Sequence, residues 1–167
     1  MWGFRSVIRL CRWSVSLLLA AAAAIGVPVA LRERATADFL ADLGRTPGFE
    51  KDTGSGPYYG AFWFDLAVVA LLILIALAVL TRGGRVWFAL AGLLSCFTAG
   101  VGVWALSGAR VEVATTLPMT GLTIALITLA GLAAVASTVG WAASSSAEAW
   151  SSVRPMIPPV PPSHQAG

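Results

Sequence analysis

Four long apolar blocks dominate this sequence and limit what the chain can fold into. They cover about residues 13–31, 61–81, 86–106 and 117–143, and the second contains the unbroken apolar stretch Leu66–Leu80. About 20 helical residues cross the ~30 Å of hydrocarbon in a bilayer, so each block is long enough to span it. The ten-residue alternating segments of a membrane β-barrel are absent, which leaves helices as the spanning form. The sequence therefore predicts an all-α, four-helix, multi-pass transmembrane bundle.

Composition excludes a soluble domain and a disordered chain. Of the 167 residues, 57% are hydrophobic and 11% are charged, whereas an ordinary soluble domain carries about 25% charged residues. A water-soluble fold with so few charges would expose large apolar patches, and disorder requires low hydrophobicity. The net charge of +3 does not indicate nucleic-acid binding, because the basic residues flank the apolar blocks and orient them. The Arg-, Ala- and Gly-rich composition without asparagine favours a bacterial origin.

Basic residues predict the orientation of the bundle. Five arginines lie before the first block or in the short turn between the second and third blocks: Arg5, Arg9, Arg12, Arg82 and Arg85. Positively charged flanks stay on the cytoplasmic side, although Arg32 and Arg34, directly after the first block, argue the other way. Four spans then place both termini in the cytoplasm, at the plasma membrane. A cleaved signal peptide is the competing interpretation of the first block, because the small residues Ala24 and Gly26 could precede a cleavage site at the end of its apolar core.

The segments outside the membrane are short. The expected parts are a basic juxtamembrane segment over 1–12, the transmembrane domain over 13–143 with an extracytoplasmic loop over 32–60, and a Ser/Pro-rich cytoplasmic tail over 144–167. Within the loop, residues 36–43 have an amphipathic pattern that predicts a short interfacial helix ending at Gly44. Residues 53–57 read as a turn-rich hinge. The tail holds six of the nine prolines and is expected to be extended or disordered.

Asp65 is the acidic residue with apolar neighbours on both sides. An ionisable side chain in a membrane helix is a candidate functional residue. Asp65 lies about one turn into the second block, where a helix N-terminus would also stabilise its negative charge. Its candidate ion-pair partners on the same side are Arg32, Arg34 and Arg110, and an ion or proton site is the alternative. The apolar blocks contain no second carboxylate to form a pair with it.

Two further residue classes are placed in a pattern. Aromatic residues near the block ends predict interfacial anchors, and residues 58–64 could alternatively line a lipid or quinone pocket. These anchors are Trp13, Tyr58, Tyr59, Trp63, Trp87, Trp104 and Trp141. Small residues at intervals of four in the third and fourth blocks predict close helix packing, within the bundle or against a partner. They are Ala91, Gly92, Ser95, Cys96, Ala99, Gly100, Ala130, Ala134, Ala136 and Gly140.

Signatures of catalysis are missing from the sequence. The single histidine, His164, and the cysteines Cys11 and Cys96 offer neither a nucleophilic triad nor metal-ligand spacing, and no cofactor or metal is expected. We therefore interpret the chain as a non-catalytic accessory or assembly subunit of a larger bacterial membrane complex, with membrane subunits and lipids as partners. Two alternatives stay open: a small oligomeric transporter or channel that uses Asp65, and a lipid- or quinone-handling membrane enzyme.

Overall fold

The computed structural model describes residues 2–45, 55–109 and 117–153, and over these residues it confirms the expected all-helical fold. Over these residues there are four α helices and no strand. The helices are α1 (Trp2–Gly44), α2 (Ser55–Thr81), α3 (Arg85–Ala109) and α4 (Leu117–Val153). Each contains a segment that is long and apolar enough to cross a membrane. This part of the sequence prediction, a four-helix multi-pass membrane protein, is therefore supported.

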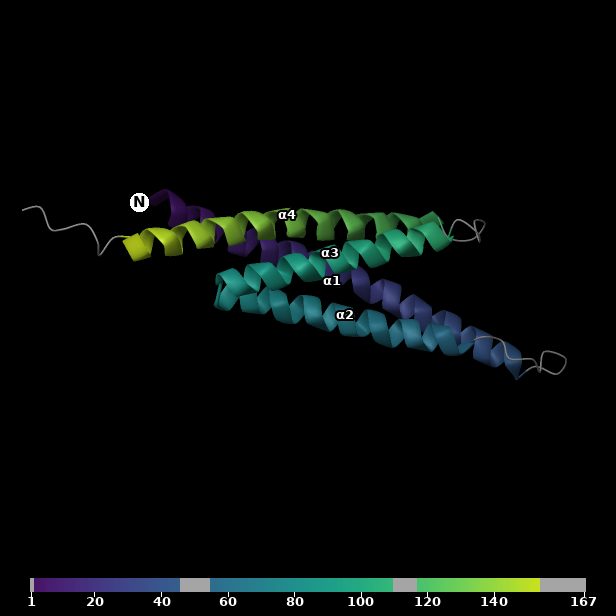
Figure 1. The fold of residues 1–167 in the computed structure, drawn as a ribbon. Coiled ribbons are helices and arrows are strands. Elements are labelled where there is room, and N and C mark those ends of the chain that lie inside the picture. Colours follow the sequence, from purple (N-terminus) through teal and green to yellow (C-terminus); the bar gives the residue numbers. More distant parts are fainter. Residues whose placement is uncertain (1, 46–54, 110–116, 154–167) are drawn as a thin grey trace, which may run out of the picture.

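The helices form two antiparallel pairs, as Figure 1 shows. α1 packs along α2, α3 packs along α4, and α1 also contacts α4 extensively, whereas α2 contacts α3 much less. The start of α1, the turn between α2 and α3, and the end of α4 lie at one end of the molecule, which we name the turn end. The opposite end, where α1 finishes and α2 begins, is the far end. The two pairs diverge toward the far end (Figure 1).

α1 is one continuous helix through Gly44, although the sequence suggested a membrane span over 13–31 followed by a separate interfacial helix. Its 43 residues correspond to a length of ~65 Å. Pro28 lies inside the helix, where neighbouring helices and local adjustment can satisfy the backbone carbonyl that proline leaves unpaired. Residues 36–43 therefore continue the helix of the first membrane segment without a break.

The other helices are also longer than the expected spans. α2 begins at Ser55 and includes Pro57, which the first turn tolerates because its N–H would have no intrahelical partner there. Much of the expected loop over 32–60 is thus helical. α4 continues from the expected end at residue 143 to Val153. The proline-rich part of the tail lies outside the described residues.

The apolar core lies between α1, α2 and the α3–α4 pair. Its largest fully buried side chains include Val15 and Leu19 of α1, Leu72 of α2 and Phe88 of α3. Val15 and Leu19 are four residues apart, so they lie on one face of α1. Glycine allows close helix approach in this core: a Cβ atom on Gly140 would lie 2.5 Å from a ring carbon of Phe88. Close approach gains dispersion contacts that lipid tails do not supply.

Candidate functional site

Arg12 of α1 binds the end of α2. Its Nε donates a hydrogen bond to the Val79 carbonyl oxygen over 3.2 Å, and its Nη2 donates to the carbonyl of Leu80. One helical turn further along α1, Ser16 Oγ donates to the Ala76 carbonyl over 2.9 Å. The last carbonyls of a helix have no partner within the helix, so an arginine from another helix can satisfy them. The Arg12 guanidinium thus fixes α1 to the last turn of α2.

The turn after α2 is shaped around the same arginine. Gly83 has a φ of 52°, the left-handed conformation that suits glycine after a helix. Its N–H donates to the Ala78 carbonyl, and so does the N–H of Arg82, over 3.4 and 2.9 Å. A Cβ atom on Gly83 would overlap the side chain of Arg12. Both the backbone conformation and the space around residue 83 therefore require glycine.

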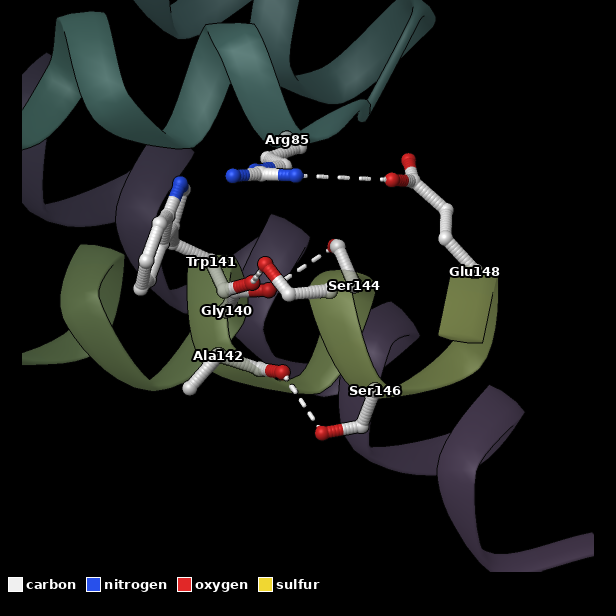
Figure 2. A network of polar contacts seen from close by, with 8 residues as sticks. Arg85, Gly140, Trp141, Ala142, Ser144, Ser146 and Glu148 are labelled. Atoms are coloured by element: carbon white, nitrogen blue, oxygen red, sulfur yellow. Dashed lines mark hydrogen bonds and ion pairs between the residues drawn. The ribbon is translucent and has the colours of Figure 1, made fainter. Parts of the chain in front are cut away.

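The remaining arginines of this turn stack on tryptophans. The guanidinium of Arg82 lies 5.6 Å from the ring centre of Trp87, and that of Arg85 lies 5.1 Å from the ring of Trp141. Arg85 also forms an ion pair with Glu148 of α4 over 3.7 Å (Figure 2). An exposed ion pair contributes about 0–1 kcal/mol. These contacts connect the start of α3 to the last turns of α4.

The serine-rich segment after residue 143 is helical, and its hydroxyl groups bond to carbonyls within α4. Ser144 Oγ donates to the carbonyl of Gly140 over 2.8 Å, and Ser146 Oγ donates to the carbonyl of Ala142 over 3.0 Å (Figure 2). Serine side chains in helices commonly bond to the carbonyl four residues earlier. The segment therefore extends α4 past the α2–α3 turn at the turn end.

At the far end, a polar network joins α1 to α2. Tyr59 donates a 2.6 Å hydrogen bond to Asp38 Oδ1. Arg34 lies 3.9 Å from the other oxygen of Asp38, and its guanidinium lies 5.6 Å from the ring centre of Phe62. Arg34 and Asp38, which lie beyond the expected first membrane segment over 13–31, thus both contact α2. The network keeps the two helices paired almost to the start of α2.

Asp65 lies near a second carboxylate, that of Glu33 in α1. The two negative charges are close enough to repel each other, and both side chains are half-buried. Neither carboxylate has a hydrogen bond or ion pair with another described residue. Arg32, adjacent in sequence, offsets part of the charge on Glu33. The arginines proposed as partners of Asp65 do not form an ion pair with it in the described residues. Arg32 is next to Glu33, and Arg34 contacts Asp38 and Phe62. Arg110 lies outside the described residues.

Sequence reasoning missed Glu33 because it placed this residue in a loop rather than in a helix paired with α2. The antiparallel register explains the proximity, since Ser16 contacts Ala76 and Arg34 contacts Phe62 on the same two helices. Arg12 was likewise counted as an orienting charge. Its spacing of four residues from Ser16 is a signal of a shared helix face, but the partner carbonyls on α2 leave no trace in the sequence.

The small residues of α3 and α4 occupy both buried and exposed positions. Ala91, Ser95 and Ala130 are fully buried. A Cβ atom added to Gly92 would lie 3.5 Å from the Cβ atom of Ser137, which is ordinary van der Waals contact. Gly140 is also buried, and Cys96 and Gly100 are exposed. The other members are half-buried: Gly92, Ala99, Ala134 and Ala136. The face that packs in α3 therefore includes Ala91 and Ser95 and leaves Cys96 on the outer surface.

The expected interfacial aromatics divide between the two ends. Trp13, Trp87 and Trp141 lie at the turn end, whereas Tyr58, Tyr59, Trp63 and Trp104 lie toward the far end. Trp13, Trp63, Trp104 and Trp141 are exposed, and Tyr58, Tyr59 and Trp87 are half-buried. Side chains at two separate levels are typical of membrane-interface belts.

Two serine hydroxyl groups and two cysteine thiols are the remaining candidate groups. The hydroxyl groups of Ser95 and Ser137 are buried in the α3–α4 contact and have no hydrogen-bond partner among the described residues. Cys11 is buried and Cys96 is exposed, and both are free thiols. Among the described residues, no three His, Cys, Asp or Glu side chains are placed to hold a metal ion. No protein-family model, curated protein or solved structure matches this chain.

Proposed function

We propose that this protein is a non-catalytic accessory or assembly subunit of a larger bacterial plasma-membrane complex, whose other membrane subunits are its partners. The observation that carries the proposal is a paired helical extension at the far end. We name residues 33–44 of α1 together with 55–61 of α2 the far projection.

Helix length supports an extension beyond the hydrocarbon. About 20 helical residues cross it, so a span that starts at Arg12 ends at Arg32, and one that ends at Thr81 starts at Phe62. Residues 33–44 of α1 then extend ~18 Å further. The Tyr59–Asp38 hydrogen bond and the Arg34–Asp38 ion pair hold this extension in one shape. A partner can bind such a preorganised element with little loss of conformational entropy.

The far projection carries an apolar side chain that a lone protein would leave in water or among lipid headgroups. Phe39 is 65% exposed and lies about 10 Å beyond Arg32 along α1. Aromatic side chains are enriched at protein interfaces because they bury a large area at low entropic cost. Phe39 is therefore the residue on which we expect an extracytoplasmic part of a partner subunit to pack.

The charge distribution supports the orientation in which both termini are cytoplasmic. Arg12 binds the last turn of α2, so the arginines before the first membrane segment lie at the same end as Arg82 and Arg85. Their positive charges act together to retain this end in the cytoplasm. The far projection is then extracytoplasmic.

Affinity purification after mild detergent extraction tests the proposal. The wild-type chain is expected to co-purify with a stoichiometric membrane partner, and Phe39→Ala is expected to lose most of it. Phe97→Ala is the matched control, because Phe97 is also an exposed phenylalanine but lies on α3 within the membrane segment. Isolation of the wild type as a lone monomer with its own activity would contradict the proposal, as would equal partner loss in both variants.

The second candidate is a small oligomeric transporter or channel that uses Asp65. The proximity of Glu33 to Asp65 favours this candidate, because two half-buried carboxylates attract a proton or another cation. Flux of a cation into proteoliposomes tests it, with Asp65→Asn as the variant. Asp42→Asn is the control, since Asp42 is an exposed acid of the far projection. Transport that is unchanged by Asp65→Asn would exclude Asp65 as the transport residue.

A further inference from the structure

Exposed arginines gather at the turn end. Arg12 is already bonded to α2, but the other four arginines of this end are exposed, and we name them the arginine rim: Arg5, Arg9, Arg82 and Arg85. Among the described residues, Glu148 is the one acidic side chain at this end, whereas Glu33, Asp38, Asp42 and Asp65 belong to the far end. The rim and Arg12 thus set five positive charges against one negative charge.

Tryptophan rings hold two of these arginines at a defined depth. Arg82 lies over Trp87 and Arg85 lies over Trp141, with distances of 5.6 and 5.1 Å to the ring centres. Tryptophan prefers the headgroup region of a bilayer. The two guanidinium groups are therefore placed near the level of the lipid phosphates. Stacking uses the face of the guanidinium plane and leaves the N–H donors along the edge of Arg82 for an oxyanion, whereas Nη1 of Arg85 also pairs with Glu148.

A third arginine of the rim, Arg9, belongs to α1. Arg9 precedes Arg12 by three residues, so it lies on the same side of α1, one turn further from the membrane segment. The side chain of Arg12 fills the space next to Gly83 in the α2–α3 turn. Arg82 is the neighbour of Gly83 in sequence. Arg9 of α1 and Arg82 of the turn are therefore each one short step from Arg12, on two different elements.

We propose that the arginine rim binds the phosphate group of an anionic phospholipid. A bidentate guanidinium matches the geometry of two phosphate oxygens. A zwitterionic lipid carries the same phosphate together with a cation that the rim repels, so the rim selects lipids of net negative charge. Each arginine near the surface is expected to raise affinity for such a lipid about fivefold, which corresponds to ~1 kcal/mol.

Quenching of tryptophan fluorescence by brominated lipids measures this selectivity. The full chain is placed in mixed bilayers, and the ratio of its association constants for phosphatidylglycerol and phosphatidylcholine is determined. The ratio for the wild type is expected to be well above one. Arg82→Gln and Arg9→Gln are each expected to lower it about fivefold. The ratio cancels any change in fluorescence caused by loss of the Arg82–Trp87 stack.

Arg45→Gln is the control variant, because it removes one exposed arginine from the far end, where Arg45 pairs with Asp42. Its ratio is expected to equal that of the wild type. Helicity measured by circular dichroism verifies that every variant is folded. If Arg82→Gln unfolds, the selectivity of Arg9→Gln decides the test. A wild-type ratio near one, or an equal decrease for Arg45→Gln, overturns the proposal. Inorganic phosphate that displaces the lipid at millimolar concentration would identify free phosphate as the ligand and would also overturn it.

Discussion

Replacement of Gly140 by alanine is expected to destabilise the α3–α4 pair. A Cβ atom at this position would lie 2.5, 2.7 and 2.9 Å from three ring carbons of Phe88, whereas carbon atoms in contact are about 3.5–4.0 Å apart. The ring must therefore move by about 1 Å. Phe88 is fully buried, so the movement displaces other core residues, and overpacking of this kind costs about 1–3 kcal/mol.

A matched substitution in the same helix isolates that cost. Gly131 also lies in α4, but a Cβ atom there would meet no atom of another described helix within 4 Å. Both substitutions remove the conformational freedom that glycine has in the unfolded chain. Its removal stabilises a helix interior by about 0.5–1 kcal/mol. Gly131→Ala is therefore expected to be neutral or stabilising. Gly140→Ala is expected to be less stable than Gly131→Ala by about 1–3 kcal/mol.

Unfolding of the detergent-solubilised protein by increasing mole fractions of SDS, followed by circular dichroism, measures these free energies. A double-mutant cycle with Phe88→Leu identifies the source of the cost. If the phenyl ring is that source, Gly140→Ala destabilises the Phe88→Leu background less than it destabilises the wild type. Equal stability of Gly140→Ala and Gly131→Ala would refute the close packing of α4 against Phe88.

Three further substitutions test the contacts between elements. Arg12→Gln is expected to lower the free energy of unfolding in SDS titrations by about 1.5–3 kcal/mol, because it removes charged hydrogen bonds to α2 carbonyls; a loss within 0.5 kcal/mol would contradict this capping role. Tyr59→Phe removes the hydrogen bond to Asp38, and hydrogen–deuterium exchange is expected to accelerate in residues 36–44 and not in α4. Glu148→Gln removes an exposed ion pair with Arg85 and is expected to change stability by at most about 1 kcal/mol, less than Arg12→Gln in the same titration.

The membrane segments could be predicted from the sequence because hydropathy and length are local properties. The segment Leu66–Leu80 has to be helical in a bilayer, whatever surrounds it. The ends of the helices were less accessible to sequence reasoning. Arg32 and Arg34 suggested the end of the first helix, yet α1 continues to Gly44, because pairing with α2 stabilises residues that a lone amphipathic segment would leave marginal.

The polar sites depended on tertiary register, which no local pattern specifies. Asp65 could be recognised in the sequence as an acid beside apolar residues. The proximity of Glu33 depends on the register in which α1 packs against α2. Arg12 carries the same positive charge as Arg9, and yet it alone bonds to the α2 carbonyls. The difference between these two arginines is one helical turn in position along α1.

The Arg12 contact has a consequence for the order in which the chain assembles. The carbonyls that it binds belong to the final turn of α2, and the glycine beside it follows that turn. During synthesis, the first helix pair therefore cannot close at this end before residue 83 has emerged. Once closed, the pair presents α1 as the surface on which α4 packs. Because α1 also packs against α4, the bundle is completed only when its last helix has been made.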